Sequence, residues 1–183
     1  VIDAFGEYSC LIEGKMIGEY TPNALEWVSG HGRTAKWKPV DISCNTFKPQ
    51  YLLKTRDIHT KLGENSNLRI VSKRITSATN KRTFIGSLIH GHGCEMNSHT
   101  LNLERPDIKN ITALLSWLNS IPCDFFNRMI CSGNALVWGV MSRIPIPNTS
   151  PLQIERCFSI ISPIAFEHNS LHNHIQKLNI SVI

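Results

Sequence analysis

The sequence has no paired cysteines of the kind that build a zinc site or a disulfide framework. Its six cysteines contain no Cys-x-x-Cys pair and follow no regular spacing, and we recognise no cleavable signal segment in it. We therefore expect reduced, mostly buried thiols in a cytoplasmic protein. The cysteines are Cys10, Cys44, Cys94, Cys123, Cys131 and Cys157.

Long apolar runs are also missing from the sequence. No stretch approaches the roughly 20 apolar residues that a membrane-spanning helix needs, so we expect no membrane partner. The chain begins with Val1 rather than Met and leads directly into a globular pattern. We expect it to be a piece of a longer protein.

The motifs of common enzyme classes are absent too. No Gly-x-Ser-x-Gly or comparable frame marks a nucleophile. Glu13-Gly14-Lys15 is the only formal match to a nuclease Glu-x-Lys arrangement, and no suitable Asp precedes it. The Gly-His-Gly triplets at 30–32 and 91–93 are the only candidates for a phosphate or cofactor loop, and we interpret both as turns. We predict no catalytic residue and no cofactor site in this chain, and its status as an enzyme stays open.

One loose group of possible metal ligands follows the second of these triplets. His90, His92, Cys94 and His99 are close together in the sequence. A structural zinc site normally has two tight pairs of Cys or His, which this group does not provide. We therefore expect a polar turn without a metal. A small metal-dependent nuclease or hydrolase that uses the His90 to His99 group remains the alternative function.

The sequence does contain enough apolar material for one core. It has 183 residues, of which 42% are hydrophobic and 18% are charged, as in ordinary globular domains. The formal net charge of +5 is compatible with a nucleic-acid partner. It does not require one, because solvated Lys and Arg side chains give the same count in many unrelated proteins.

The residue pattern predicts an α+β domain of mixed short strands with a basic hairpin and a C-terminal pair of helices. Frequent glycines favour short strands and turns over 8–40. Apolar residues at roughly helical spacing suggest a short helix in 49–63. Two β-like runs, 67–80 and 82–89, flank a polar loop.

Three further helices are predicted in the second half of the chain. The spacing of Ile111, Leu114, Leu115 and Leu118 predicts an amphipathic helix over 108–119. The segment 123–133 is typical of a second helix that ends at a glycine, Gly133. A weaker pattern indicates a helix over 152–161.

The loop between the two β-like runs carries an unusual density of polar binding groups. Within ten positions it supplies two arginines, a lysine, an asparagine and several hydroxyl side chains. Arginine can bind phosphate or the O6/N7 edge of guanine, and asparagine can bind the N6/N7 edge of adenine. Alternatively the loop is structural, with Asn80 in a left-handed turn and Arg82 paired with an internal acid.

Five blocks in a fixed order give a more specific signal than any single motif. They are "LIEGKMIGEY" with "WVSGHGRTAKW", then "PQYLL", "LRIVSKRITSATNKRTFIGSLI", "LLSWLNSIPCDFFNRMICSG" and "IPIP". Over roughly Leu11 to Pro147 the chain resembles the TaqI-like C-terminal specificity domain of adenine-specific DNA methyltransferases, including fused type IIG restriction-modification enzymes and related phage-defence methylases.

The resemblance implies a target recognition domain at 1–150, followed by a divergent or truncated helical tail at 151–183. Such a module binds duplex DNA and recognises a short sequence, while a catalytic methyltransferase domain or subunit uses S-adenosylmethionine to methylate an adenine that is rotated out of the stack. The family's Asn-Pro-Pro-aromatic motif and glycine-rich cofactor motif do not occur in this chain. It therefore carries no S-adenosylmethionine site, and methyl transfer is expected only of the missing domain.

The resemblance and the loop chemistry together give a set of candidate residues. The predicted DNA-binding residues are Arg33, Lys36, Lys73, Arg74, Thr79, Asn80, Lys81 and Arg82. Further residues match the family motifs and include fold-shaping positions: Gly14, Lys15, Met16, Gly30, Gly32, Thr83, Asn119, Asp124, Phe125 and Arg128.

Asp124 and Arg128 are four positions apart and are expected to pair on one helix face. We expect Trp117 and Phe125 in the core rather than stacked on bases. One departure is His90-Gly91-His92, which follows the "SLI" run where the family usually has proline.

Overall fold

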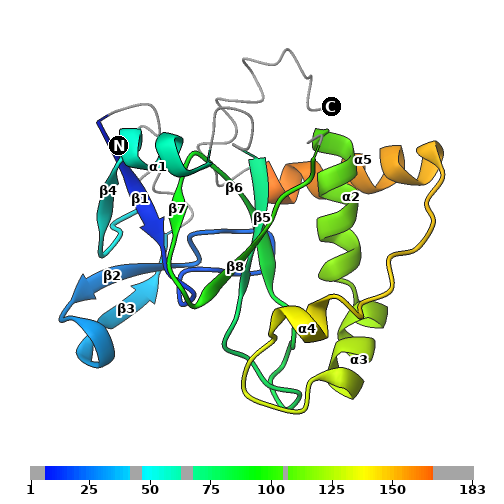
Figure 1. Ribbon diagram of the computed structural model, residues 1–183, viewed down its shortest axis with the longest axis horizontal. Coiled ribbons are helices and arrows are strands. Elements are labelled where there is room, and N and C mark those ends of the chain that lie inside the picture. Colours follow the sequence, from blue (N-terminus) through cyan, green and yellow to red (C-terminus); the bar gives the residue numbers. More distant parts are fainter. Residues whose placement is uncertain (1–6, 42–46, 63–67, 105–106, 167–183) are drawn as a thin grey trace.

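Small β-sheets and a group of helices make up the fold of the computed structural model, which describes residues 7–41, 47–62, 68–104 and 107–166 (Figure 1). The predicted α+β class is confirmed. The strands are β1 (Tyr8–Ile12), β2 (Leu25–Ser29), β3 (Lys36–Pro39), β4 (Leu52–Lys54), β5 (Leu68–Lys73), β6 (Gly86–His90), β7 (Gly93–Cys94) and β8 (Ser98–Leu101). The helices are η1 (Gly32–Thr34, a 3-10 helix), α1 (Thr55–Leu62), α2 (Ile108–Leu118), α3 (Ile121–Ile130), α4 (Trp138–Met141) and α5 (Pro151–Phe166).

The strands of the described residues form three small sheets. The first has the order β4-β1-β7, in which β4 is antiparallel and β7 parallel to β1. The second is the β2–β3 hairpin, with Trp27 opposite Trp37. The third has the order β6-β5-β8, and both neighbours run antiparallel to β5. Because β5 pairs on both sides, it is the central strand of the third sheet. Helix α2 packs against β5 and β6, and the loop that joins these two strands begins at the end of β5.

The larger apolar core lies between the third sheet and the helices. Ile70 of β5 and Leu88 of β6 are fully buried there, together with Ile111 and Leu115 of α2. These α2 positions belong to the stripe that predicted the helix, and α2 is confirmed almost residue for residue. A second cluster forms on the other side of the sheet, where Val71 packs with residues of β1 and the following turn.

Helix α5 completes the larger core. It packs along α2, and Phe158, Ile161 and Ala165 are buried in the same cluster. The predicted helix over 152–161 is therefore longer than expected, since it continues to Phe166 with Pro163 inside it. A proline removes one backbone donor but does not by itself end a helix that is held by packing. The domain boundary placed after residue 150 stays a prediction.

Other predicted boundaries also differ from the structure. The first β-like run, 67–80, is a strand only as far as Lys73, and the strand in the second, 82–89, begins at Gly86. The segment 49–63 contains a strand before its helix, because the backbone of β4 pairs with β1 and α1 begins only at Thr55. Helix α3 ends at Ile130, where Cys131 is already extended, so Gly133 is not its cap. At its other end the hydroxyl of Ser120 accepts a hydrogen bond from the Cys123 backbone, which gives the helix a regular N-cap.

The described cysteines agree with the expectation of free, mostly buried thiols. Cys10, Cys123 and Cys131 are buried, and Cys94 and Cys157 are half-buried, none in a disulfide. Burial raises the pKa of the Cys94 and Cys123 thiols to about 11. Cys44 lies outside the described residues. In the described ranges no helix is both long and apolar enough to cross a membrane.

Candidate nucleic-acid interface

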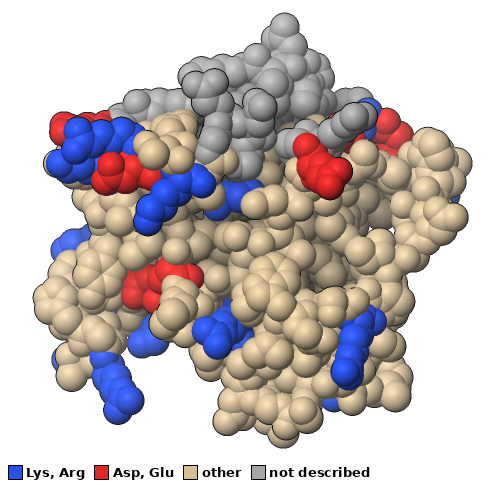
Figure 2. Space-filling model, in the orientation of Figure 1, with Lys and Arg blue, Asp and Glu red and all other residues tan. Residues whose placement is uncertain are grey.

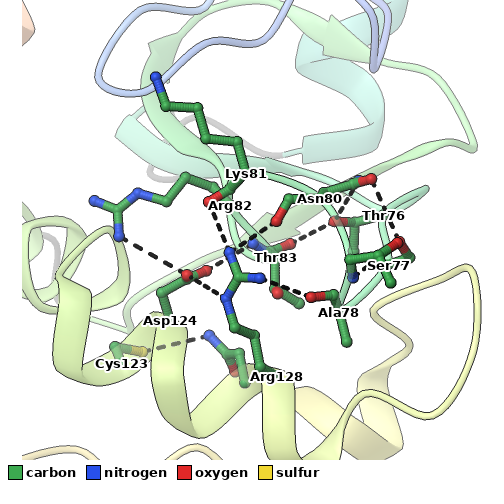
Figure 3. Close-up of polar contacts among 12 residues, drawn as sticks. Thr76, Ser77, Ala78, Asn80, Lys81, Arg82, Thr83, Cys123, Asp124 and Arg128 are labelled. Atoms are coloured by element: carbon green, nitrogen blue, oxygen red, sulfur yellow. Dashed lines mark hydrogen bonds and ion pairs between the residues drawn. The ribbon is translucent and has the colours of Figure 1, made fainter.

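The loop that joins β5 to β6, residues 74–85, is held from below by helix α3. Arg128 donates three hydrogen bonds of 2.7 Å to the carbonyl oxygens of Ala78, Asn80 and Lys81 (Figure 3). A planar guanidinium has enough donors in a fixed geometry to bind several carbonyls at once. The polypeptide of the β5–β6 loop therefore wraps around one side chain from α3.

Asp124 holds the returning end of the same loop. Its carboxylate accepts a hydrogen bond of 2.6 Å from the Thr83 backbone N–H and another of 2.9 Å from Nε of Arg128. The predicted pairing of Asp124 with Arg128 along one helix face is thus confirmed. Asp124 is only 7% exposed, so this pair, which we call the α3 clamp, is shielded from water on the carboxylate side.

Arg82 is engaged in the fold rather than free at the surface. Its Nε lies 3.3 Å from a carboxylate oxygen of Glu19, and its terminal nitrogen donates to the carbonyl of Asn119 at 3.0 Å. A longer contact of 3.9 Å reaches Asp124. The structure therefore favours the interpretation in which Arg82 pairs with internal acids.

The remaining polar side chains of the β5–β6 loop hydrogen-bond largely to one another. The Thr76 hydroxyl donates to the carbonyl of Thr83 at 2.7 Å, and the hydroxyls of Ser77 and Thr79 are 2.8 Å apart. Asn80 contacts Thr76 and Ser77 through its side-chain amide. The left-handed conformation suggested for Asn80 is wrong, because Tyr20 is the only described non-glycine residue with positive φ.

Three cations at this end of β5 have no carboxylate partner in the described part of the chain. Lys81 is exposed at the loop tip. Arg74 is half-buried and makes one long hydrogen bond of 3.4 Å to the Met96 carbonyl. Lys73 is half-buried, and this burial lowers the pKa of its ammonium group. The charges of these three side chains are therefore not neutralised by a carboxylate of the described residues.

The other two predicted cations lie on the β2–β3 hairpin. Arg33 is an exposed residue of η1 at the tip, and Lys36 is an exposed residue of β3. Neither side chain makes a hydrogen bond or ion pair within the described ranges. In Figure 1 the hairpin tip and the β5–β6 loop both lie towards the lower edge of the molecule.

The view in Figure 2 shows Lys and Arg side chains as separate patches rather than one continuous basic surface. Some lie over the β2–β3 hairpin, and others are mixed with acidic side chains around α1 and β4. The predicted DNA-binding residues therefore form two groups, one on the hairpin and one at the β5–β6 loop.

The possible metal ligands do not converge. His92 is buried, and its Nδ1 lies 2.8 Å from the Ser9 hydroxyl, which itself donates to the Gly91 carbonyl. A hydroxyl has one proton, so Nδ1 of His92 is the donor in this pair. His99 instead lies against the Trp138 ring, 4.8 Å between ring centres. Among the described residues no group of three or more His, Cys, Asp or Glu side chains is placed to hold a metal ion.

The same contacts argue against nucleophilic catalysis at Ser9. The hydroxyl is fully buried, and the histidine beside it donates to it rather than taking its proton. Burial and the nearby Arg69 lower the pKa of His92 to about 4. The Ser9–His92 pair therefore joins β1 to the β6–β7 turn as a neutral structural contact.

The Glu13-Gly14-Lys15 segment also makes contacts that belong to the fold. The parallel pairing of β1 with β7 brings Glu13 beside Glu95, whose carboxylate accepts a hydrogen bond from the Gly14 backbone at 2.8 Å. Burial and this second carboxylate raise the pKa of Glu13. Both Gly-His-Gly triplets form turns, with positive φ at Gly30, Gly32 and Gly91.

One prediction about α3 is wrong. Phe125 is 65% exposed, and Ile121 and Met129 on the same helix face are more than two-thirds exposed. The polar face of α3 is the buried one, because it holds the β5–β6 loop. Trp117 behaves as expected, since it is half-buried against the larger core.

Comparison with known proteins adds no relative: no protein-family model matches the chain, and no curated protein sequence matches it.

Proposed function

We propose that this chain binds duplex DNA as the target recognition module of an adenine-specific DNA methyltransferase or fused restriction-modification enzyme. The catalytic domain or subunit that would bind S-adenosylmethionine and transfer the methyl group lies outside this chain. Under this proposal the protein works in the cytoplasm, where its DNA substrate and reduced thiols are found.

The observation that carries the DNA-binding part concerns the six cations among the predicted DNA-binding residues. Arg82 pairs with carboxylates of the fold, and the other five do not. Five of them have no carboxylate partner within the described ranges, and all five lie on the hairpin or at the β5–β6 loop. They are Arg33, Lys36, Lys73, Arg74 and Lys81. Cations without a carboxylate partner, on two segments that both lie towards the lower edge in Figure 1, suit the phosphate backbones of a duplex, which supply most of the affinity of such complexes.

The rigid β5–β6 loop supports the same proposal. A module that recognises DNA sequence has to hold the duplex in register while a base is rotated out of the stack. The α3 clamp fixes the loop backbone before any ligand arrives, so little conformational entropy would be lost on binding. Lys81 and Arg74 would then act mainly on phosphates.

The test is binding of the purified chain to a random duplex library across a salt series. We expect salt-dependent binding and enrichment of a short sequence, with a slope of log affinity against log salt of about −0.9 per phosphate contacted. Arg74→Ala and Lys81→Ala should each reduce the slope by about one phosphate contact.

Matched controls exist on α1, which lies away from both groups in Figure 1. Arg56→Ala and Lys61→Ala remove the same charge from exposed positions of that helix, where Arg56 makes only a solvent-exposed ion pair of 3.5 Å with Asp57. Equal losses of DNA affinity in the α1 variants and in the two β5–β6 loop variants would indicate a general charge effect without a defined interface. Absence of salt-dependent binding by the unmodified chain would contradict the proposed function itself.

A further inference from the structure

The β2–β3 hairpin is a two-stranded ribbon that forms its own sheet and projects from the body of the molecule (Figure 1). Its pairing runs from Leu25 opposite Pro39 to Ser29 opposite Lys36, with a register shift between Trp27 and Ser29. The tip closes through η1, and all four residues from His31 to Thr34 are exposed.

The backbone of the tip is fixed, although the Arg33 side chain makes no hydrogen bond or ion pair in the described ranges. Gly30 has φ of 77°, and a Cβ atom there would lie 2.5 Å from the carbonyl oxygen of Thr34, so only glycine fits this close approach. The indole N–H of Trp27 donates to the Gly30 carbonyl at 2.8 Å. The backbone N–H of Thr34 donates to the backbone carbonyl of His31 at 3.1 Å and closes the turn.

The base of the hairpin is attached to the rest of the chain. The Lys48 ammonium lies 4.6 Å from the centre of the Trp27 ring, and the Trp27 backbone donates to the Lys48 carbonyl. Glu26 pairs with Lys38 at 2.8 Å and also accepts from the Lys48 backbone. Trp37 packs against the second apolar cluster. The ribbon is thus held at its base and presented at its tip.

The chemistry of the tip suits an anionic partner with polar edges. From Trp27 to Val40 the chain has no Asp or Glu, while Arg33 and Lys36 have no partner in the described structure. The major groove of B-DNA, about 12 Å wide, admits a two-stranded ribbon. An arginine there can bind O6 and N7 of guanine, and a lysine on the flank can bind phosphate.

We infer that the β2–β3 hairpin enters the major groove, with Arg33 on a guanine edge and Lys36 on the phosphate backbone. This inference rests on the proposed function and assigns sequence recognition to the hairpin, while the β5–β6 loop contributes phosphate contacts. The assignment follows because the β2–β3 hairpin carries Arg33, whose side chain has no partner in the described ranges, on a projecting tip with a fixed backbone.

The experiment compares Arg33→Ala, Arg33→Lys and Lys36→Ala for binding to the sequence enriched from the library and to an unrelated duplex. Arg33→Ala should lose about 10- to 100-fold in affinity for the enriched sequence and little for the unrelated one. Lys36→Ala should lower the affinity for both duplexes equally, and it should reduce the slope of log affinity against log salt by about one phosphate contact. Arg33→Lys should recover only part of the discrimination, since lysine lacks the bidentate fork.

A second measurement tests the named base edge directly. Replacement of each guanine in the enriched site by 7-deazaguanine removes the N7 acceptor without removing the base pair. At one guanine we expect a loss for the unmodified protein and almost no further loss for Arg33→Ala, because both changes remove the same contact. Denaturation curves of the variants should match that of the unmodified chain, since the Arg33 and Lys36 side chains make no hydrogen bond or ion pair in the described ranges.

The outcomes separate the two proposals. Unchanged discrimination in Arg33→Ala, with sequence-specific binding intact, would overturn the hairpin assignment and leave the proposed function standing. No DNA binding by the unmodified chain would overturn both. Additive losses from 7-deazaguanine and Arg33→Ala at every guanine would show that Arg33 does not contact N7.

Discussion

The β5–β6 loop and the β2–β3 hairpin carry similar side chains but use them differently. In the loop, Arg82 binds Glu19 and the Asn119 carbonyl, and the backbone is wrapped around Arg128. In the hairpin, Arg33 has no internal partner, and the tip is fixed by its backbone and by Trp27. The loop is the more basic segment in sequence, yet the hairpin presents its arginine more openly.

The difference shows that the density of cations in a sequence does not measure their availability. An arginine near buried carboxylates or orphan carbonyls is used by the fold, because leaving those acceptors unpaired would cost free energy. On the projecting ribbon, Lys38 has such an acceptor in Glu26, whereas the side chains of Arg33 and Lys36 have none in the described ranges. Substitutions in the two segments test this contrast.

Replacement of Asp124 by Ala should disrupt the loop more than any other single change at its surface. The substitution removes the acceptor of the Thr83 N–H and leaves Arg128 without its carboxylate. We expect a loss of about 3 kcal/mol in the free energy of unfolding, as for other buried pairs that lose one partner. Chemical denaturation measures this loss. Glu19→Ala, at a more exposed acid, should cost less than about 1 kcal/mol, and equal costs would contradict the ranking.

Acid should destabilise the body that carries the loop, since it contains a buried histidine. The pKa of His92 is lowered to about 4 in the fold, against about 6.5 in the unfolded chain. Its stabilising contribution is therefore complete above pH 6.5 and is lost as the pH falls towards 4, by about 3 kcal/mol in total. Denaturation curves between pH 7 and 4 measure this, and His92→Gln should flatten the dependence even if it lowers stability overall.

A change confined to the hairpin should have a smaller effect on stability than on DNA binding. Gly30→Ala forces a side chain into a left-handed position beside the Thr34 carbonyl, which should cost about 1–2 kcal/mol of local strain. We expect a mobile tip and weaker binding to the enriched sequence, with the same affinity for unrelated DNA. Hydrogen exchange at the tip and at the β5–β6 loop distinguishes local from global loosening. Gly32→Ala is the matched control, because Gly32 shares the positive φ, at 54°, but no atom lies within 4 Å of its added Cβ, so the two variants differ in the clash with the Thr34 carbonyl.

The neighbours Lys81 and Arg82 offer the finest test of the contrast. Lys81→Ala should change the free energy of unfolding by less than about 0.5 kcal/mol and reduce the salt slope of DNA binding. Arg82→Ala should cost about 1–2 kcal/mol, because it leaves the Asn119 carbonyl and Glu19 without their donor. Denaturation and binding measured on both variants would reject the contrast if Arg82→Ala affected binding alone.

The sequence predicted the regular elements well where periodicity was strong. The stripe of α2 and the i, i+4 pair of α3 could be identified because both depend on residues close together in the chain. The partners of the basic loop could not, since Glu19 and Asn119 are separated from Arg82 by 63 and 37 positions. No local pattern indicates that pairing.

Other misses have the same origin. The exposure of Phe125 follows from α3 turning its polar face inwards to hold a loop, which reverses the usual reading of an amphipathic helix. The strand at Leu52 depends on pairing with β1, more than 40 positions away in sequence. The resemblance to methyltransferase specificity domains and the DNA-binding role of the candidate residues stay predictions.

The contacts of Arg128 have a consequence for how this protein can change over evolution. All three loop hydrogen bonds of this side chain go to main-chain carbonyls, so they are indifferent to the identity of the residues that supply them. Ala78 and Lys81 could be exchanged for many other amino acids while the loop kept its shape. The surface chemistry of this segment can therefore diversify on a constant backbone, which separates the acquisition of new binding preferences from the risk of misfolding.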